Sequence, residues 1–221
     1  MMNQVLLFDL DGTLLDSRDA VIEAVADTAE QFAPGHFSQE ELFARFGESF
    51  DDFLLDVARA AGKMDKNEVL DHYFGYVREH LADHAKLFPR VRENLEQLKE
   101  AGYQLAVVTN KHREFAQTSL RLAGIDRMFE TIVAVDDVAC GKPSPEPLQK
   151  VLSDLGKRPD EAMMIGDSRF DVLAAKAAGV PAVVLEWYGR EVWTQVIPEY
   201  RYPDFETFAA EMLTVKTKAG G

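Results

Sequence analysis

Two carboxylates stand one residue apart at the end of an apolar run near the N-terminus. The run is VLLF at residues 5–8, and Asp9 and Asp11 follow it. In a strand, residues i and i+2 project from the same face, so both carboxylates are expected to point to one spot. Like charges held this close repel each other, and burial adds to the cost of keeping them charged. A cation beside the pair would offset that repulsion.

Polar side chains follow three later apolar runs in the same way. They are Thr109, Asn110 and Lys111 after QLAVV, Lys142 in GKPSPEP, and Asp167 after MMIG with Asp171 four residues further on. In an open parallel sheet, ligands bind beyond the carboxyl ends of the strands. We therefore expect these side chains to share one crevice.

The residue types in this crevice indicate a particular chemistry. Clustered carboxylates suit a hard cation such as Mg²⁺, which commonly takes one or two of them together with waters and phosphate oxygens. A threonine hydroxyl and a lysine ammonium are donors suited to the remaining phosphate oxygens. One carboxylate could attack phosphorus and the other could carry a proton. Because phosphoryl transfer depends mostly on positioning and charge neutralisation, little else is required.

The spacing of the apolar runs predicts the elements that hold these residues. Helical patterns separate the later runs, and each pattern ends at a glycine, which is a common helix stop signal. Runs with little alternation are typical of strands covered on both faces. We predict an α/β fold with a parallel sheet built from right-handed βαβ units. The predicted strands span residues 5–9, 104–110, 131–137, 163–167 and 181–187.

One long segment departs from this rhythm. Residues 17–87 contain no convincing strand, but Ser38 with Glu41 and Ser49 with Asp52 fit the capping pattern of helix starts. We predict an inserted helical unit, and a core made of the chain on either side of it. The predicted boundaries are 1–16 and 88–214 for the core, 17–87 for the insertion, and 215–221 for a disordered tail.

Four short motifs resemble those of the haloacid dehalogenase superfamily, in the same order and spacing. They are DLDGTLLDS, VVTNK, GKPSPEP and IGDSRFD. The helical insertion looks like the cap of the phosphoglycolate-phosphatase-like branch. The resemblance covers nearly the whole chain apart from the tail, and it implies a Rossmann-like core with helices flanking the parallel sheet.

The resemblance implies roles for the catalytic residues. Asp9 would be the nucleophile that becomes an aspartyl phosphate, and also a Mg²⁺ ligand. Asp11 would act as general acid and then general base, with its backbone carbonyl on the metal. Thr109 and Lys142 would hold the phosphoryl oxygens, and Lys142 would also counter the charge of Asp9.

The resemblance extends to the residues around this core. Asp167 would ligate Mg²⁺, and Asp171 would support the metal shell. Gly12 would let the backbone turn away from the sheet, and Asn110 would offer its main-chain N–H to phosphate. Asp171 also has a purely structural interpretation, because Ser168-x-x-Asp171 is itself a capping box.

Substrate specificity is the least determined property. We expect it to come from Arg45 and Gly47 in ARFGESF and from Lys111 after the second strand, with Arg45 as a cation for a substrate carboxylate. The alternative for Arg45 is a place on the solvent face of its helix. Asp16 and Ser17 are interpreted as helix start signals, and His36, His72, His80 and His84 as surface or packing residues.

Composition limits the classes of partner. The chain has 24 Lys and Arg against 38 Asp and Glu, a formal charge of −14, which argues against a general nucleic-acid binder. A single cysteine, Cys140, leaves no internal disulfide and fits a reducing compartment. Without an apolar run of about 20 residues, we expect no membrane span. We expect a cytoplasmic protein, a monomer or homodimer, whose partner is a small phosphorylated metabolite.

The expected activity is Mg²⁺-dependent hydrolysis of a small, phosphoglycolate-like phosphate monoester through an aspartyl phosphate. Asp11 argues against the dehalogenase branch, which lacks this acid, and against the phosphonatase branch, which has a small residue there. Inorganic pyrophosphatase, nucleotide phosphatase and sugar-phosphate mutase remain alternatives. From a different class, a non-catalytic binding protein on the same fold is also open.

Overall fold

A parallel sheet forms the centre of the molecule. The computed structural model describes residues 5–46, 50–62, 67–189 and 196–219. Within them, six strands pair in the order β3-β2-β1-β4-β5-β6, and every pair is parallel. The strands are β1 (Val5–Phe8), β2 (Gln104–Val108), β3 (Thr131–Val133), β4 (Ala162–Gly166), β5 (Ala182–Leu185) and β6 (Tyr200–Tyr202). The α/β fold predicted from the sequence is therefore confirmed.

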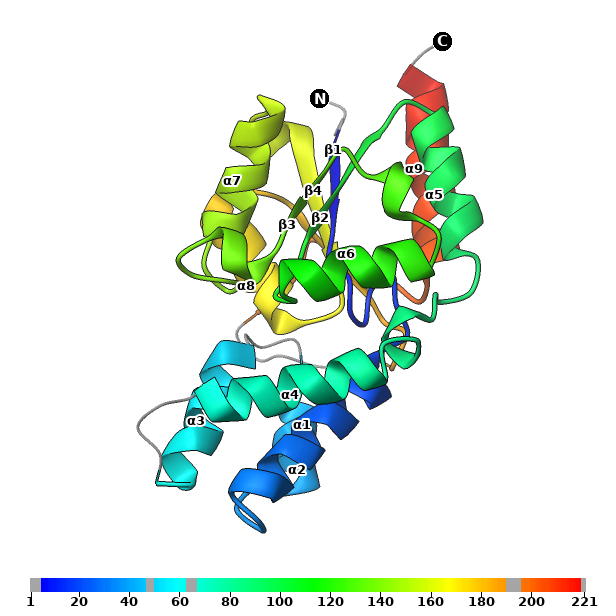
Figure 1. The fold of residues 1–221 in the computed structure, drawn as a ribbon. Coiled ribbons are helices and arrows are strands. Elements are labelled where there is room, and N and C mark those ends of the chain that lie inside the picture. The colour runs from blue at the N-terminus through cyan, green and yellow to red at the C-terminus, as the bar shows by residue number, and fades with distance from the viewer. Residues whose placement is uncertain (1–4, 47–49, 63–66, 190–195, 220–221) are drawn as a thin grey trace.

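Helices cover both faces of this sheet (Figure 1). Along β1, Leu6 and Phe8 pack toward α5, α6 and α9, whereas Val5 and Leu7 pack toward α7 and α8. This alternation explains why the strand is apolar at every position, since neither side faces water. The helices are α5 (Val91–Glu100), α6 (Arg113–Leu122), α7 (Glu146–Leu155), α8 (Arg169–Ala178) and α9 (Phe205–Ala219).

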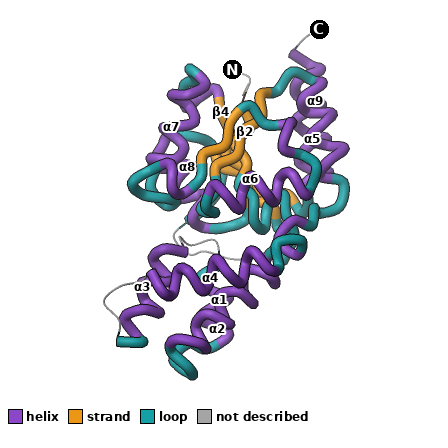
Figure 2. Tube along the Cα trace, viewed as in Figure 1, coloured by secondary structure: helices purple, strands orange, loops and turns teal. Residues whose placement is uncertain are grey.

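The inserted segment is helical among its described residues, as Figure 2 shows. Its helices have an apolar cluster of their own, to which α6 of the core contributes Phe115. Ser38 and Glu41 form the predicted capping box, whereas Ser49 lies outside the described residues. The elements are α1 (Arg18–Phe32), α2 (Gln39–Ala44), α3 (Phe50–Ala60), α4 (Asn67–Glu79) and the 3₁₀ turn η1 (Asp83–Ala85).

The chain enters and leaves the insertion at the same place. Leu15 pairs with Leu87 in an antiparallel bridge, and the Asp16 N–H donates to the Lys86 carbonyl at 2.8 Å. The Phe88 N–H donates to the Leu14 carbonyl at 3.1 Å. These bonds join residues 14–16 to residues 86–88, and the unit boundaries expected from the sequence remain predictions.

The C-terminal part differs from the sequence-based prediction. The strand β6 was not predicted, and α9 continues to Ala219, through most of the segment 215–221 that we expected to be disordered. The helix continues because the sequence offers no Gly or Pro stop signal there and its last turns contact the core. The Tyr103 hydroxyl donates to the Met212 carbonyl at 2.9 Å, and the Lys216 ammonium lies 4.4 Å from the Tyr103 ring centroid.

The third strand is also shorter than predicted. It ends at Val133, and residues 135–137 form a 3₁₀ turn, η3. The Asp137 carboxylate accepts the Ala134 N–H at 2.7 Å and pairs with the Arg113 guanidinium. These bonds turn the chain away from the sheet direction.

The contact between α9 and β1 generates a stability prediction. Phe208 is fully buried and its ring lies edge-on to Phe8, with centroids 6.4 Å apart. We expect Phe208→Ala to lower the free energy of unfolding by about 3–5 kcal/mol, because it removes a large core side chain and leaves a cavity. Urea denaturation measures this loss. The control is Leu122→Ala, at a side chain that is 58% exposed, where a change above about 0.5 kcal/mol is not expected. Equal losses in both variants would contradict the packing described here.

Candidate active site

The site begins where β1 ends. The Asp9 N–H donates to the Ile165 carbonyl at 2.9 Å, so Asp9 extends the pairing of β1 with β4 by one residue. Its carboxylate is buried, at 5% exposure, and faces the carboxyl ends of the neighbouring strands. The structure therefore places Asp9 at the edge of the sheet where the sequence predicted it, and its role as nucleophile remains a prediction.

Lys142 lies between two of the acidic groups. Its ammonium is 2.8 Å from Asp9 and 2.6 Å from Asp171, and it donates to the Val108 carbonyl at 3.0 Å. The side chain is 1% exposed, so these three contacts replace its hydration. Burial by itself lowers the pKa of Lys142, but the two carboxylates outweigh burial and raise that pKa. Lys142 is therefore a fixed positive charge.

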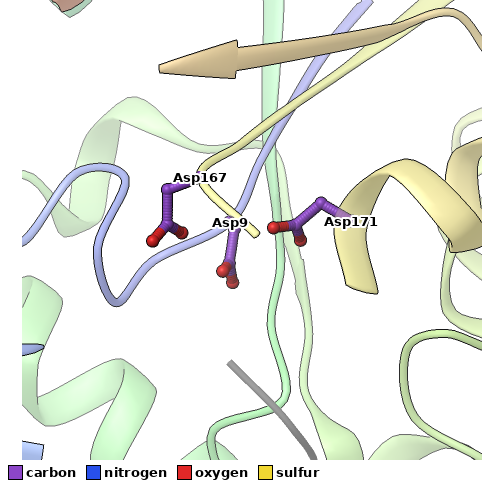
Figure 3. Close-up of side chains that lie close together, drawn as sticks. All are labelled: Asp9, Asp167 and Asp171. Carbon is purple, nitrogen blue, oxygen red and sulfur yellow. The ribbon is translucent and has the colours of Figure 1, made fainter. Parts of the chain in front are cut away.

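Three carboxylates from different elements lie close together (Figure 3). Asp9 comes from the end of β1, Asp167 from the loop after β4, and Asp171 from the first turn of α8. Each offers an oxygen, and these oxygens all lie within 4.8 Å of one another. Among the described residues, this is the group whose spacing suits a metal ion.

Two glycines allow the carboxylates to come this close. A Cβ at Gly12 would lie 2.3 Å from an Asp167 oxygen, and the φ of Gly12 is +79°. A Cβ at Gly166 would lie 2.3 Å from the Asp171 carboxyl carbon. Gly12 therefore has the turn role predicted for it, whereas Gly166 was not singled out from the sequence.

Asp171 makes the capping contacts that the sequence left open, and its support of a metal shell remains a prediction. One of its oxygens accepts the Lys142 ammonium, and the other accepts the Ser168 N–H at 3.1 Å and the Ser168 hydroxyl at 2.7 Å. It caps α8 and also lies in the carboxylate cluster. Thr13, which the sequence analysis missed, donates its hydroxyl to Asp167 at 3.1 Å.

The electrostatics of the cluster favour a bound cation. Burial first, and then the charge of Asp171, raise the pKa of Asp9 to about 7 although Lys142 lowers it. Burial and the charges of Asp171 and Asp9 raise the pKa of Asp167 well above its ordinary value. Three carboxylates thus share one lysine, and a divalent cation would remove the remaining repulsion. The carboxylate donor set fits Mg²⁺, a hard ion that prefers oxygen ligands.

Asp11 has a different environment from Asp9. Both of its oxygens lie 2.9 Å from the Lys111 ammonium, and the Ser17 hydroxyl donates to one of them at 2.6 Å. Burial raises the pKa of Asp11, but the charge of Lys111 and the bond from Ser17 outweigh burial and lower it. The two acids that the sequence places together therefore differ in their partners and in the direction in which their pKa is shifted.

Ser17 corrects one interpretation made from the sequence. It stands at the N-cap position of α1, but its side chain makes no capping bond because the hydroxyl is directed to Asp11. Asp16 accepts the Tyr188 hydroxyl at 2.9 Å. A capping pattern and a bond to a buried carboxylate use the same residue type, so the sequence could not separate them.

The other residues of the second motif hold the site together. The Asn110 side chain accepts the Lys142 N–H and donates to the Lys142 carbonyl, both at 2.8 Å. The Thr109 hydroxyl accepts the Lys111 N–H at 3.2 Å and is buried. The expected bonds from Thr109 and from the Asn110 N–H to phosphate remain predictions.

His84 is a buried residue beside Asp11 that lacks hydrogen bonds. Among the described residues, neither ring nitrogen has a hydrogen-bond partner. Burial and then the charge of Lys111 lower its pKa to about 4, whereas Asp11 raises it. The ring is therefore neutral, in agreement with the packing role that we expected for His84.

Of the expected specificity residues, Lys111 lies at the site and Arg45 lies away from the carboxylate cluster. The Arg45 guanidinium pairs with Asp56 at 2.9 Å and lies 4.7 Å from the Phe53 ring centroid, within the insertion. Its role toward a substrate carboxylate remains a prediction. Gly47 lies outside the described residues. Lys111 is brought to the site, but as the partner of Asp11.

The comparisons with known proteins agree with this geometry. A family model described as haloacid dehalogenase-like hydrolase matches residues 6–185. The chain belongs to the haloacid dehalogenase-like hydrolases. This match confirms the resemblance inferred from the four motifs and identifies the chain as an enzyme.

Named relatives of this hydrolase cover most of its length. Pyrophosphatase PpaX of Bacillus velezensis is 36% identical over 197 residues, which are 88% of this chain and 89% of that protein. Pyrophosphatase PpaX of Halalkalibacterium halodurans is 35% identical over 199 residues, again 88% and 89%. A solved structure described as a predicted phosphoglycolate phosphatase from Haemophilus somnus has a TM-score of 0.81 at 28% identity, covering 96% of this chain and 97% of that one. These names agree with the predicted class, phosphoric ester hydrolase.

The expectation about membranes can also be compared with the structure. In the parts of the chain described above, none of the helices has the length and apolar character needed to cross a bilayer.

The carboxylate cluster generates a prediction about metal binding. We expect Mg²⁺ to raise the melting temperature, since a ligand at 100 times its Kd stabilises the folded state by about 2.7 kcal/mol. Asp167→Asn should lose most of that gain. Without metal, the variant should melt higher than the unmodified protein at neutral pH, because a raised carboxyl pKa means that the ionised form of Asp167 destabilises the fold.

Thermal denaturation with and without Mg²⁺ measures both effects. The matched control is Asp154→Asn on α7, at a side chain that is 42% exposed and paired with Lys150. An Mg²⁺ response of Asp167→Asn equal to that of the control would show that the cluster does not hold the metal.

Proposed function

We propose that the chain is a Mg²⁺-dependent phosphatase that uses Asp9 as its nucleophile, and that inorganic pyrophosphate is the first candidate substrate. The observation that carries this proposal is the position of the Asp9 carboxylate. It pairs with the Lys142 ammonium, and one of its oxygens lies within 4.8 Å of an oxygen of Asp167 and of Asp171. A carboxylate with a fixed ammonium and a metal-type cluster beside it suits attack on phosphorus.

The proposed reaction has two steps. The Asp9 carboxylate attacks phosphorus, and the bond from phosphorus to the leaving oxygen breaks while Asp11 gives that oxygen a proton. Asp11 then takes a proton from the water that attacks the aspartyl phosphate, which releases phosphate and restores Asp9. Lys142 and Thr109 donate to the phosphoryl oxygens. A bound divalent cation, held by Asp9, Asp167 and Asp171, supplies charge neutralisation.

Asp11 must change partner for this sequence to proceed. In the described structure Lys111 and Ser17 keep it ionised, so it can donate a proton only after these contacts loosen and it has taken up a proton from solvent. The insertion supplies Ser17 at its first residue, and we propose that residues 17–87 act as a cap whose closure moves Asp11. Closure would also exclude bulk water from the site while Asp9 attacks phosphorus.

The relatives favour pyrophosphate over the phosphoglycolate-like ester that the sequence suggested first. Two pyrophosphatases at 35–36% identity support it, whereas phosphoglycolate phosphatase is supported by a solved structure at 28% identity. Nucleotide hydrolysis and the mutase reaction have no comparable support among these proteins. A non-catalytic role is disfavoured because every motif residue is present at the site.

The cellular setting belongs to the same proposal. The single cysteine supports a reducing, cytoplasmic setting, and the formal charge of −14 argues against a nucleic-acid partner. The proposed partner is a small phosphorylated metabolite, which the site and the phosphatase relatives support. We propose a monomer or homodimer without nucleic-acid or membrane partners.

Replacing the nucleophile tests the proposed chemistry. Asp9→Asn keeps the size of the side chain but cannot form an aspartyl phosphate, so we expect kcat to fall by at least about 1000-fold. Phosphate release from pyrophosphate and from 4-nitrophenyl phosphate, in the presence of Mg²⁺, is the measurement. Circular dichroism confirms folding, and Asp154→Asn is the control. Turnover by Asp9→Asn within tenfold of the control would rule out this nucleophile.

A substrate comparison tests the order of candidates. With the unmodified protein and Mg²⁺, we expect kcat/KM for pyrophosphate to exceed that for 2-phosphoglycolate, glucose 1-phosphate and AMP. We also expect EDTA to abolish phosphate release from each. A higher kcat/KM for 2-phosphoglycolate would reverse the order, and activity that persists in EDTA would reject the metal dependence.

A further inference from the structure

A cleft of about 380 Å³ opens beside the carboxylate cluster. Asp167 lines it and also belongs to the group of Asp9, Asp167 and Asp171, so the cleft borders that group. The insertion lines it with Arg18, Phe43, Ala44 and Phe46. The core lines it with residues after β4, with residues in and after β5, and with Arg201 of β6. Its volume is within the usual range of small-molecule sites, about 300–1,000 Å³.

The charges in this cleft are unevenly compensated. Arg201 pairs with Glu186 at 2.9 Å, and Asp167 belongs to the metal-type cluster. Arg18 has a long 4.0 Å contact to Asp19, whose side chain is 86% exposed. Among the described residues, no ion pair is found for Arg169. The wall next to the cluster therefore carries two arginines whose charges are weakly compensated by described groups.

Arg18 is held in place by aromatic contacts. Its guanidinium carbon lies 3.6 Å from the Tyr188 ring centroid and 5.8 Å from that of Phe43. The Tyr188 hydroxyl in turn donates to Asp16 at 2.9 Å. Stacking fixes the plane of a guanidinium and leaves its edges available for hydrogen bonds.

Arg18 also has an unused buried donor. Its Nε is buried and has no hydrogen-bond partner among the described residues. A buried donor without a partner costs free energy, which a ligand oxygen would recover. A guanidinium edge fits two oxygens of a phosphate or carboxylate side by side.

We propose that Arg18 and Arg169 form a subsite for a negatively charged leaving group. The subsite lies beyond Asp167 and would bind the second phosphoryl group of pyrophosphate or a carboxylate in the equivalent position. This inference rests on the proposed phosphatase function and deepens it, because it assigns selectivity to residues of α1 and α8. Arg45, by contrast, pairs with Asp56 inside the insertion.

The first test compares substrates in Arg18→Gln and Arg169→Gln. We expect the ratio of kcat/KM for pyrophosphate to that for 4-nitrophenyl phosphate to fall about 10- to 100-fold in Arg18→Gln, the range expected for a lost charge-assisted hydrogen bond. The fall should be smaller in Arg169→Gln, because Arg169 is exposed. The control is Arg158→Gln. Arg158 lies before the amino end of β4, whereas the site lies at the carboxyl ends of the strands, so this variant should leave the ratio unchanged.

2-Phosphoglycolate is measured in the same series. A fall in the ratio for either anionic substrate supports the subsite, and the larger fall identifies whether phosphoryl or carboxylate oxygens are preferred. The proposal would be overturned if kcat/KM fell equally for 4-nitrophenyl phosphate and for the substrates with a second anionic group. A ratio that stays constant in both arginine variants would also overturn it. Because Arg169 is exposed and on another helix, its variant still tests the proposal if Arg18→Gln does not fold.

A binding measurement separates this proposal from the proposed function. Calorimetry with Mg²⁺ gives the Kd of methylenediphosphonate, which carries a second anionic group, and of methylphosphonate, which does not. We expect Arg18→Gln to raise the first Kd at least about tenfold more than the second. Selective loss of binding in a protein that hydrolyses none of the substrates would support the subsite and reject the function. Unchanged methylenediphosphonate binding in both variants, or none by the unmodified protein, would reject the subsite.

Discussion

The ammonium of Lys142, placed between Asp9 and Asp171, holds the site together. Without it, buried carboxylates at the end of β1 and the start of α8 would repel each other in a medium where repulsion is strong. Lys142 reaches them from the loop before α7, and Asn110 fixes that loop by bonding to both backbone groups of Lys142. Lys142 thereby contacts the ends of β1 and β2 and the start of α8, from a loop that leads into α7. The sheet positions the residues, and this lysine lets them stay close.

The two acids of the first motif show how environment separates like residues. Asp9 shares Lys142 with Asp171 and lies in an excess of negative charge, whereas Asp11 has Lys111 to itself together with the Ser17 hydroxyl. Opposite shifts in pKa follow from these partners. Two carboxylates with environments that push their pKa values apart are the usual basis for different roles in one active site.

Much of the fold and site could be predicted because the signals were local. Continuous apolar runs gave the strands β1, β2, β4 and β5, and polar residues at their ends gave the cluster. The strand β6 has only three residues, with Tyr200 exposed, so periodicity could not find it. The partners of Asp11 were missed for another reason. The direction of the side chains across the fold decides whether Ser17 caps α1 or bonds Asp11. It also decides whether Lys111 faces substrate or Asp11.

The antiparallel bridge between Leu15 and Leu87 affects how freely the insertion can vary in length. Because its two ends are hydrogen-bonded neighbours, the insertion is a closed loop attached to the core at one place, whatever its length. The entropy of closing a flexible loop grows only with the logarithm of its length, about 0.6 kcal/mol for each doubling. Residues could therefore be gained or lost between these ends with little effect on the strand order. Substrate preference could then diversify through the insertion while the chemistry at Asp9 stays constant.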